Sequence, residues 1–593
     1  MAEYWIRPFD LGPYGSNDGT SYADAWYRTR DVAISGGDTL YISGTLDDGA
    51  SDGYAFTQIF RSPDITGTAL NPIVIDGAPP AQPAGKIIAG GVNKINTGDW
   101  FDEGSGVWSL AGVTGSASWL YNEVEAWEYG GRMIRDFGSV PATGDAPAFY
   151  KDGANKLWYA PISGTPLAPV WTSGGSIFDF FSATFTADGD HAPDYVTIKN
   201  LKLRNSPNMI RAQQCTGWVI DNCDIGWAPG IGISLKDGVE FCTIQNCEIH
   251  DLISGIYAST RTETAAVNQN VSDCLIDTNH IFDIRNYYQV GGDCHAIGWQ
   301  SGSRNVLSNN TIEDCQGTGI TIYYWGARVG KDLDSFDNVV EDNIVRRIQN
   351  LEQDIGDPGS SAIGIEITGD NTGRTSVQEA RNIIRNNTVS FCSKELEPPA
   401  SGDHGWGIRL KTHKFTSVAL SGNTIHDCTY GHYLYSQNVD GGSGDGVAGG
   451  VLNNETVYDC EHKIGYQGID DVTGYLISNM TYSGLGDFEV LKNAAVAADC
   501  TNLGMAWDYP TSGYCTLSTT PKYNLYTRGV LGVPNVLIRN KGAVQPTFPI
   551  ALSNELIRNK GAVQPVQSGS ISVGSGSKSG PGLTFGSMGR MGA

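Results

Sequence analysis

Basic residues are scarce in this chain of 593 residues: 39 Lys and Arg stand against 64 Asp and Glu, and the formal net charge is −25. Proteins that bind double-stranded nucleic acid present basic surfaces, so nucleic acid is not an expected partner. Long apolar runs are missing as well. No stretch approaches 18 uninterrupted apolar residues, so membrane insertion is not expected. The N-terminus, Met1 to Trp5, has no basic segment followed by an apolar run, which predicts folding in a cytosol without a secretory signal.

Motifs for cofactor binding are also missing. The sequence has no Gly-rich phosphate loop, no zinc-ligand spacing and no serine-elbow motif, so we expect no required cofactor. Calcium is the one ion with candidate ligands, because Glu352, Asp354 and Asp357 place three carboxylates close together and Ca2+ prefers oxygen ligands. Their spacing matches no dedicated calcium loop.

What the sequence does contain is a repeat. Ten segments share the order apolar, polar, polar or small, any residue, polar, apolar, from Ile198–Leu203 to Ile477–Tyr482. The fourth position of each segment is a register mark, and successive marks are 22 to 44 residues apart: Leu201, Cys223, Cys247, Asn279, Asn310, Asn343, Asn387, Asn423, Glu455 and Met480. The shortest spacings fit one coil of three short strands, and longer spacings indicate inserted loops. The sequence therefore predicts an all-β fold, a right-handed parallel β-helix (a single-stranded solenoid) of about ten or more coils.

Two columns of this repeat have a physical reading. Asparagines at successive register marks would lie about 4.8 Å apart, so that their amides can bond from coil to coil, and Asn also tolerates the left-handed backbone region. From the mark Cys223 on, the residue five positions after each mark is apolar or Cys: Ala228, Leu252, Ile284, Cys315, Ile348, Cys392, Cys428, Cys460 and Leu485. This column should face the interior, which makes its cysteines core residues and neither disulfides nor metal ligands.

A second recurrent strand places a small residue before Ile, as in Gly232-Ile233 and Gly255-Ile256. We expect this strand to carry an exposed groove. Side chains alternate along a strand, so Ile233, Ile256, Ile297, Ile320, Ile363 and Ile408 should face inward. The nearer outward column is then Tyr257, Gly298, Thr321, Gly364, Arg409 and Tyr433, and the farther one is Ser259, Gln300, Tyr323, Glu366, Lys411 and Tyr435. This register makes Glu366 and Lys411 neighbours on adjacent coils.

Several segments carry a family resemblance: Tyr4–Pro8, Gly15–Trp26, Gly37–Ile42, Asn71–Ile75, Asn309–Ile312 and Asn386–Val389. They resemble the pectate-lyase-like right-handed β-helix superfamily over about residues 1–500. Within it, an acidic chain without a signal peptide and with a Gly/Ser-rich end resembles a bacteriophage tail spike. The β-helix cap begins within the first few residues here, whereas tail spikes usually carry a separate particle-binding head. Fold alone does not fix chemistry, because this superfamily includes lyases, hydrolases, isomerases and inactive binders.

The resemblance implies an organisation and a location. We expect an N-terminal cap and first coils over 1–85, an irregular β insertion or early coils over 86–190, the β-helix core with groove loops over 191–500, a C-terminal β region over 501–566 and a Gly/Ser-rich tail over 567–593. The expected partners are a bacterial polysaccharide, phage tail or baseplate proteins and two further copies of the chain in a homotrimer. The expected location is the virion tail, with synthesis in the host cytoplasm; the alternative is secretion.

Three functions stay open at this point. The first is a virion-associated spike that binds and cleaves a capsule, an exopolysaccharide or an O-antigen, as a polysaccharide lyase or a glycoside hydrolase. The second is a non-catalytic receptor-binding or structural spike. The third is a bacterial polysaccharide lyase.

Candidate catalytic residues come from the groove strand and the segments before it. In a lyase, as the resemblance implies, Arg409 would neutralise a uronate and Lys411 would abstract the C5 proton. In a hydrolase, Glu366 would be one member of a carboxylate pair, with Asp370, Asp354 or Asp357 as its partner. Two further Asp and His pairs have a candidate role in proton transfer: Asp293 with His295, and Asp403 with His404.

Aromatic and amide side chains near the same strand are candidate sugar-binding residues, because aromatic rings combine apolar faces with polar edges. They are Tyr257, Trp299, Gln300, Tyr323, Tyr324, Trp325, Trp406, Tyr433 and Tyr435. One further feature has no assigned role: Leu537–Pro546 is repeated identically as Leu556–Pro565.

Overall fold

The computed structural model describes residues 2–8, 13, 15–26, 32, 34–47, 66–88, 94–95, 97–112, 119–122, 133–135, 139, 148–161, 166, 170–172, 178–179, 192–206, 208–228, 230–259, 270–285, 294–300, 302–324, 335–349, 362–369, 378–392, 405–411, 415–416, 418–436, 449–468, 474–478, 481–483, 487–492, 506–507 and 515–516. The chain divides into two units, 1–541 and 542–593, and every described residue belongs to the first.

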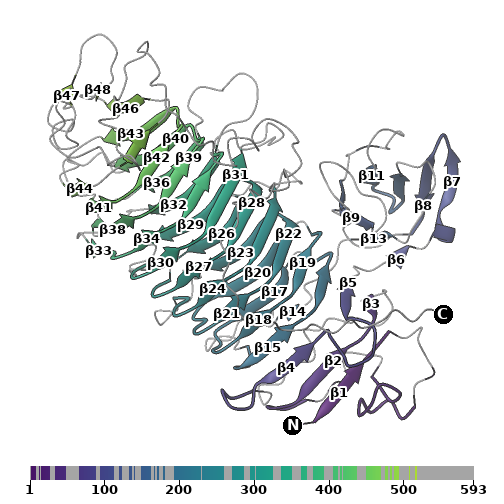
Figure 1. Cartoon of the computed structure of the whole chain (residues 1–593). Coiled ribbons are helices and arrows are strands. Elements are labelled where there is room, and N and C mark those ends of the chain that lie inside the picture. Colours follow the sequence, from purple (N-terminus) through teal and green to yellow (C-terminus); the bar gives the residue numbers. More distant parts are fainter. Residues whose placement is uncertain are drawn as a thin grey trace, which may run out of the picture. The chain divides into compact units, whose positions relative to one another are not determined.

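Three long parallel sheets dominate the described structure (Figure 1). The first sheet has 13 strands, in the order β1 (Glu3–Ile6), β2 (Thr39–Ile42), β4 (Ile73–Asp76), β15 (Val196–Lys199), β18 (Val219–Asp221), β21 (Thr243–Gln245), β24 (Leu275–Asp277), β27 (Val306–Ser308), β30 (Val339–Glu341), β34 (Ile383–Arg385), β38 (Val418–Ser421), β41 (Gly449–Asn453) and β44 (Gly474–Ser478).

The second sheet has 12 strands, in the order β3 (Thr45–Asp47), β5 (Lys86–Ile88), β16 (Lys202–Arg204), β19 (Asp224–Gly226), β22 (Glu248–Leu252), β25 (His280–Ile284), β28 (Thr311–Gln316), β31 (Ile344–Gln349), β35 (Thr388–Ser390), β39 (Thr424–His426), β42 (Thr456–Tyr458) and β45 (Thr481–Ser483).

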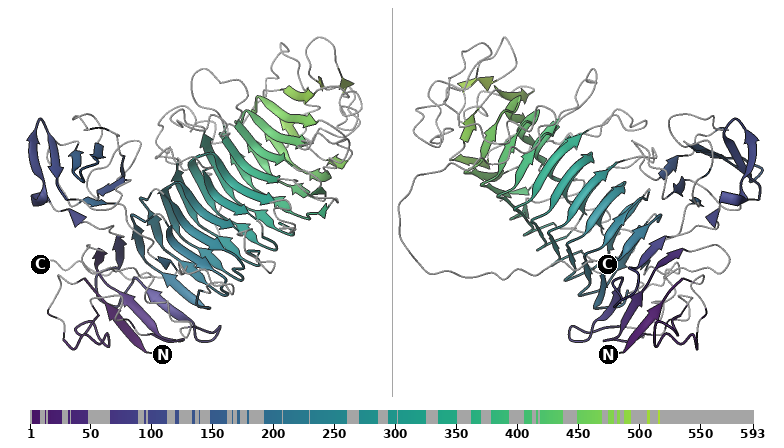
Figure 2. Two further views of the ribbon diagram at one scale, coloured as in Figure 1. Left: turned by 180° about the vertical axis from the view of Figure 1, so that it is seen from behind. Right: turned by 45° about the vertical axis from the view of Figure 1, so that its right-hand side comes forward.

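The third sheet has 11 strands, in the order β14 (Phe178–Asp179), β17 (Asn208–Gln213), β20 (Ile231–Lys236), β23 (Ser254–Ser259), β26 (His295–Gln300), β29 (Thr318–Tyr324), β32 (Ala362–Gly369), β36 (Gly405–Lys411), β40 (Tyr430–Ser436), β43 (His462–Gly468) and β46 (Asp487–Lys492). The views in Figure 2 follow the same strands, stacked side by side, from two other directions. Because each coil contributes one strand to each sheet in turn, the chain forms a parallel β-helix, as the repeat predicts.

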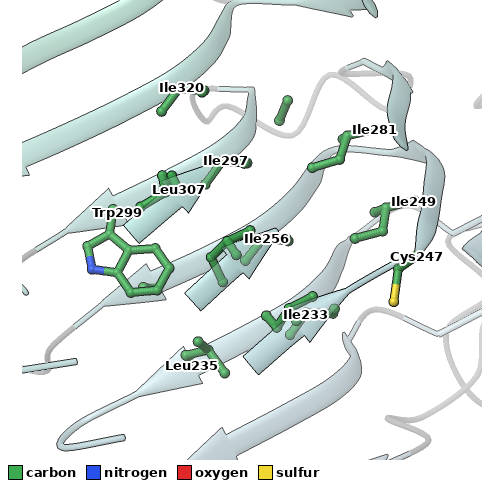
Figure 3. Packing of buried hydrophobic residues seen from close by; sticks show 14 of the residues in the cluster. Ile233, Leu235, Cys247, Ile249, Ile256, Ile281, Ile297, Trp299, Leu307 and Ile320 are labelled. Atoms are coloured by element: carbon green, nitrogen blue, oxygen red, sulfur yellow. The ribbon is translucent and has the colours of Figure 1, made fainter. Parts of the chain in front are cut away.

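The core is built from the inward column of each sheet. Ile220, Ile244, Ile276 and Leu307 are partners on successive strands of the first sheet, and all four are fully buried. Figure 3 shows such residues packed together, with Ile256, Ile297 and Ile320 of the third sheet among them. The predicted Cys-containing column is also buried, from Ala228 through Cys460; Leu485 lies outside the described residues. The ten cysteines whose side chains are described are free and buried, so the prediction that the cysteines of this column serve as core residues is confirmed.

The predicted asparagine ladder is present. Asn279, Asn310, Asn343, Asn387 and Asn423 are buried, and each Nδ2 up to Asn387 donates to the Oδ1 of the next Asn at 2.9–3.0 Å. The left-handed backbone, however, belongs to the residue before each ladder Asn, such as Asn309 (φ 54) and Asn386 (φ 57). The predicted amide ladder and the predicted left-handed backbone therefore fall on two adjacent residues of the turn, and not on the same residue.

A second, shorter ladder joins Asn305, Asn338 and Asn382. Asn305 Nδ2 donates to Asn338 Oδ1 at 2.9 Å, and the backbone N–H of Asn338 donates to Asn382 Oδ1 at 2.8 Å. These residues precede strands of the first sheet, at the ends of the inserted segments. Unequal insertions hide this register in the sequence.

Between β5 and β14 the chain forms two antiparallel sheets. One has the order β10 (Met133–Arg135), β9 (Trp119–Asn122), β13 (Val170–Thr172) and β6 (Lys94–Ile95); the other has the order β11 (Ala148–Lys151), β12 (Leu157–Ala160), β8 (Val107–Leu110) and β7 (Phe101–Gly104). A 3-10 helix, η4 (Thr97–Asp99), precedes β7. Trp100, Phe149, Leu157 and Tyr159 form a small core of their own. Two short pairs complete the strands, β33 (Gln378–Glu379) with β37 (Phe415–Thr416), and β47 (Ala506–Trp507) with β48 (Cys515–Thr516).

The lengths of the connections single out the third sheet. From β15 to β45, each step from the first to the second sheet has two connecting residues. Connections that enter or leave the third sheet reach 10 to 15 residues, as over 260–274, 285–294, 325–338, 350–361, 391–404 and 437–448. The insertions anticipated from the repeat therefore border one sheet. No helix among the described residues is long and apolar enough to cross a membrane.

Candidate functional site

The outward face of the third sheet has a central column of polar and aromatic residues. Strand register makes neighbours of Ser234, Tyr257, Gly298, Thr321, Glu366, Arg409 and Tyr433. A second outward column contains Tyr323, Thr368, Lys411 and Tyr435. A third contains Ser254, His295, Thr318, Ile363, Trp406 and Tyr430.

The sequence-based register of β32 was wrong by two residues. Ile365, and not Ile363, is the inward partner of Ile320 and Ile408. Glu366 therefore lies between Thr321 and Arg409, whereas Lys411 is paired with Thr368. The strand reads Ala-Ile-Gly-Ile-Glu-Ile, so Ile363 and Ile365 both follow a small residue, and either one satisfies the predicted inward pattern.

Glu366 and Arg409 form an ion pair at the centre of this face. Arg409 Nε donates to Glu366 Oε1 at 2.6 Å, and Arg409 Nη2 contacts the same oxygen. Glu366 is only 4% exposed, and the Arg409 guanidinium lies 4.3 Å from the ring centre of Trp406. The pair is thus shielded from water, which strengthens its charge-assisted hydrogen bonds.

An aromatic cluster adjoins this pair. Trp406 and Tyr433 stack with ring centres 5.0 Å apart, and Tyr430 meets Tyr433 edge-on at 5.3 Å. With Ile363 these residues form a buried cluster separate from the core. Ile363 therefore faces outward, contrary to its predicted inward position. Trp406 and Tyr433 stay substrate-binding candidates, although at 6% and 5% exposure most of their ring surface already packs against neighbours.

The opposite end of the central column is organised around Tyr257. A Cβ on Gly298 would lie 2.8 Å from Tyr257 Cδ2, so glycine leaves the space that this ring occupies. Lys236 Nζ contacts Ser259 Oγ and lies 5.2 Å from the Tyr257 ring centre. His295 Nδ1 is 3.2 Å from Thr321 Oγ1, and the His295 ring is stacked 6.2 Å from that of Tyr257. This end presents a half-buried ring beside a cation.

One predicted site residue is a core residue. Trp299 is fully buried and packs with the inward side chains of the helix (Figure 3). Strand alternation explains the correction, because Trp299 is two residues from the inward Ile297 and pairs with the inward Ile322. Gln300 and Tyr323 are half-buried register partners on the outward face.

Several other candidates lie outside the described residues: Asp293, Asp403, His404 and Trp325, as well as Glu352, Asp354, Asp357 and Asp370. The side chains of Tyr324, Lys411 and Tyr435 are likewise outside the description, although their backbones belong to β29, β36 and β40. Among the described residues there is no group of three His, Cys, Asp or Glu residues arranged to hold a metal ion. The calcium prediction stays a prediction.

A charged cluster on the second sheet was not predicted. His250 is 7% exposed; its Nε2 lies 3.0 Å from Asp224 Oδ1 and its Nδ1 lies 2.8 Å from Asp251 Oδ2. Arg204 Nη2 donates to the same Asp224 oxygen at 2.7 Å. Phe282 stacks on the imidazole with ring centres 5.0 Å apart. The adjacent pair His250-Asp251, which recurs as His426-Asp427 in the corresponding turn, was the available sequence signal.

Electrostatics couple these groups. Burial acts to lower the pKa of His250, but its hydrogen bonds to Asp224 and Asp251 outweigh burial and raise that pKa. Burial acts to raise the pKa of Asp224, but hydrogen bonds from His250 and Arg204 hold it well below its usual range. Both ring nitrogens of His250 are engaged by carboxylates, so this cluster stabilises the coil and offers no free base.

The comparisons with known proteins concern the fold. Residues 186–354 match the family model described as "Right handed beta helix region", so this part of the chain is a right-handed β-helix. A search among curated proteins finds no match.

Solved structures similar to the chain include three named for carbohydrate chemistry. A glycoside hydrolase has 11% identity and a TM-score of 0.40, covering 82% of this chain and 96% of its own. An alginate lyase from Paenibacillus sp. str. FPU-7 has 14% identity and a TM-score of 0.34, covering 68% and 92%. The tailspike protein of E. coli bacteriophage HK620 in complex with a pentasaccharide has 12% identity and a TM-score of 0.32, covering 54% of each chain. Similarity at this level does not transfer an activity or a substrate.

Proposed function

From a right-handed β-helix whose third sheet has the long bordering segments, we propose that this protein binds a bacterial surface polysaccharide along that sheet and cleaves it. The observation that carries the proposal is the outward column from Tyr257 to Tyr433, which combines rings, hydroxyls and an ion pair on consecutive coils. Such a column suits an extended polymer of repeating polar units, because each coil offers a similar set of contacts at a spacing of about 4.8 Å.

Glu366 is the residue to which we assign the central role. On the outward face of the strands from β17 to β43 it is the one described carboxylate, and Arg409 fixes one of its oxygens. A hydrolase needs a second carboxylate, which the adjoining segments 350–361 and 370–377 supply in sequence through Asp354, Asp357 or Asp370. In a lyase Lys411 would act as the base, and Arg409 would pair with a uronate.

A screen of purified protein against capsular, exopolysaccharide and algal polymers tests the proposal. New reducing ends without absorbance near 235 nm indicate a hydrolase, and new reducing ends with that absorbance indicate a lyase. In a hydrolase Glu366→Gln should lower kcat by about 100-fold or more, because the group loses its proton-transfer role. Retained polymer binding without cleavage would favour the non-catalytic spike. An absence of both binding and cleavage across the panel would contradict the proposal.

A matched control lies on the first sheet. Glu341 pairs with Arg385 of the next coil, with Arg385 Nε donating to Glu341 Oε2 at 2.6 Å, so Glu341→Gln breaks a similar inter-coil pair away from the third sheet. It should leave cleavage unchanged. Equal losses in both variants would mean that Glu366 acts only through stability.

We also propose that the protein is a virion component resembling a tail spike, with the polysaccharide as host receptor and phage tail or baseplate proteins as its attachment partners. The acidic composition and the Gly/Ser-rich residues 567–593 support this reading. Gold-labelled antibody against the purified chain should decorate the tails of particles produced from the encoding genome. Label in the culture medium alone would favour the secreted bacterial lyase.

A further inference from the structure

The antiparallel sheet with the order β11, β12, β8 and β7 (Figure 1) carries three aromatic rings on one face. Strand register makes neighbours of Tyr150 and Trp158, of Trp158 and Ser109, and of Ser109 and Phe101. These positions form a line across all four strands, and its three rings are termed the aromatic row. Tyr150 and Trp158 are half-buried and Phe101 is 67% exposed, so the aromatic row lies at the surface of the described structure.

The opposite face of the same sheet supplies the small core of this part of the chain. Phe149 and Tyr159 are fully buried and cluster with Trp100. Because side chains alternate along a strand, Tyr150 and Trp158 lie on the other face from Phe149 and Tyr159. The aromatic row is therefore not part of this core, and large rings gathered on a solvent-facing surface indicate a binding role.

An ion pair interrupts the aromatic row at Ser109. Glu103 Oε1 accepts from Ser109 Oγ at 2.6 Å and from Lys156 Nζ at 2.5 Å. The same Nζ lies 3.9 Å from the ring centre of Trp158, whose Nε1 donates to Asp152 Oδ2 at 3.2 Å. These contacts hold the indole in one orientation, so little side-chain entropy would be lost when it meets a ligand.

The order ring, ring, ion pair, ring suits a saccharide. A sugar presents C–H groups on its faces, which pack on aromatic rings, and hydroxyl groups on its edge, which bond to polar and charged side chains. Three inter-strand steps extend over about 14 Å, which is long enough for a short oligosaccharide. The centre of a protein interface is apolar and poor in charge, whereas here a charged pair lies within the line of rings.

Charge favours a neutral saccharide over an acidic one. Hydrogen bonds from Lys156 lower the pKa of two carboxyl groups, that of Glu103 through Nζ and that of Asp152 through the backbone N–H. Both carboxyl groups are therefore ionised at neutral pH, and the single ammonium group of Lys156 balances only one of them. A uronate or another anionic sugar would meet repulsion at this face.

We propose that the aromatic row is a carbohydrate-binding site for a neutral saccharide, on a sheet of its own and additional to the site on the third sheet. It places the chemistry of binding in the segment between β5 and β14, outside the stacked coils. The proposal rests on Tyr150, Trp158 and Phe101 and does not depend on cleavage or on Glu366.

Affinity electrophoresis of the full chain tests this proposal, in native gels that contain dextran, laminarin, galactomannan or arabinoxylan, with alginate as the acidic comparison. At least one neutral polymer should retard the wild type. Combining Phe101→Ala with Trp158→Ala should weaken that binding by at least about tenfold, because two ring contacts are lost. Phe101→Ala alone removes an exposed ring and should weaken binding several-fold at an unchanged melting temperature, so the test does not depend on how well the double variant folds.

Phe241→Ala is the matched control. Phe241 is 59% exposed and lies in the turn before β21 of the β-helix, so its removal should leave binding unchanged. The proposal would be overturned if no neutral polymer retarded the wild type, if the double variant bound as the wild type does, or if Phe241→Ala lost binding equally. Retardation by alginate alone that disappears in the double variant would overturn the assignment to a neutral saccharide. Cleavage by the double variant is measured separately, so that failure of the aromatic row and failure of the proposed function are distinguishable.

Discussion

Replacing Asn343 with Ala should be among the most destabilising single substitutions in this protein. Asn343 Nδ2 donates to the carbonyl of Leu307 and to Asn387 Oδ1, each at 2.9 Å. Its Oδ1 accepts from the backbone N–H of Asn310 at 2.9 Å and from Asn310 Nδ2 at 3.0 Å. Asn343 is 1% exposed, so water cannot replace these bonds in the folded protein.

The expected magnitude comes from these four hydrogen bonds. Each contributes about 1 kcal/mol net, and donors left unpaired in a buried site cost more. We therefore expect Asn343→Ala to lower the free energy of unfolding by about 4 kcal/mol. The neighbouring Asn309→Ala is the control: Asn309 is exposed, donates one side-chain bond to Asp277 at 2.8 Å and has a φ of 54°. Losing that bond and straining Ala in the left-handed region should cost about 1 to 2 kcal/mol.

Guanidinium unfolding followed by tryptophan fluorescence provides the assay. The two variants should shift the midpoint by different amounts at an unchanged slope, since the surface exposed on unfolding stays the same. Equal midpoints for Asn343→Ala and Asn309→Ala would refute the reasoning, because the buried ladder would then add nothing beyond an exposed turn bond.

Three further outcomes follow from the described contacts. Folding raises the pKa of His250, so the stabilisation by its protonated ring is full below the unfolded pKa of about 6.5 and is lost as the pH rises through the folded pKa. The melting temperatures of the wild type and of His250→Gln should therefore converge toward alkaline pH. A constant difference between them from pH 5 to 9 would contradict this. Native protein should react with Ellman's reagent at no more than two of its twelve cysteines. Burial shields the thiols and raises their pKa, for Cys274 to about 12. In guanidinium all twelve should react. Gly298→Ala should displace the Tyr257 ring and weaken polysaccharide binding several-fold at an unchanged melting temperature, and unaltered binding would remove Tyr257 from the site.

The sequence by itself determined the solenoid. Each coil must bury the same inward positions, so Ile244, Ile276 and Leu307 recur in register, and an Asn at one turn position can pair only with its equivalent one coil away. These constraints are local and repeated, and a repeat can be recognised without knowing how the coils are packed. The inward cysteine column and the insertions follow from the same period.

Only the tertiary structure decided the outward faces, because an outward side chain is constrained by its neighbours and not by the period. In β32, Ile363 and Ile365 both follow a small residue and satisfy the repeat, and only the folded structure shows that Ile365 is the inward partner, which pairs Glu366 with Arg409. Trp299 was a candidate sugar-binding residue because of its aromatic ring, but it occupies an inward position of its strand and is fully buried. At the end of the ladder, Glu455 takes the place of Asn and lies 3.0 Å from the inward His432 with both side chains fully buried. A pairing between a strand position and a turn position has no periodic signature in a sequence, since only folding brings those two positions together.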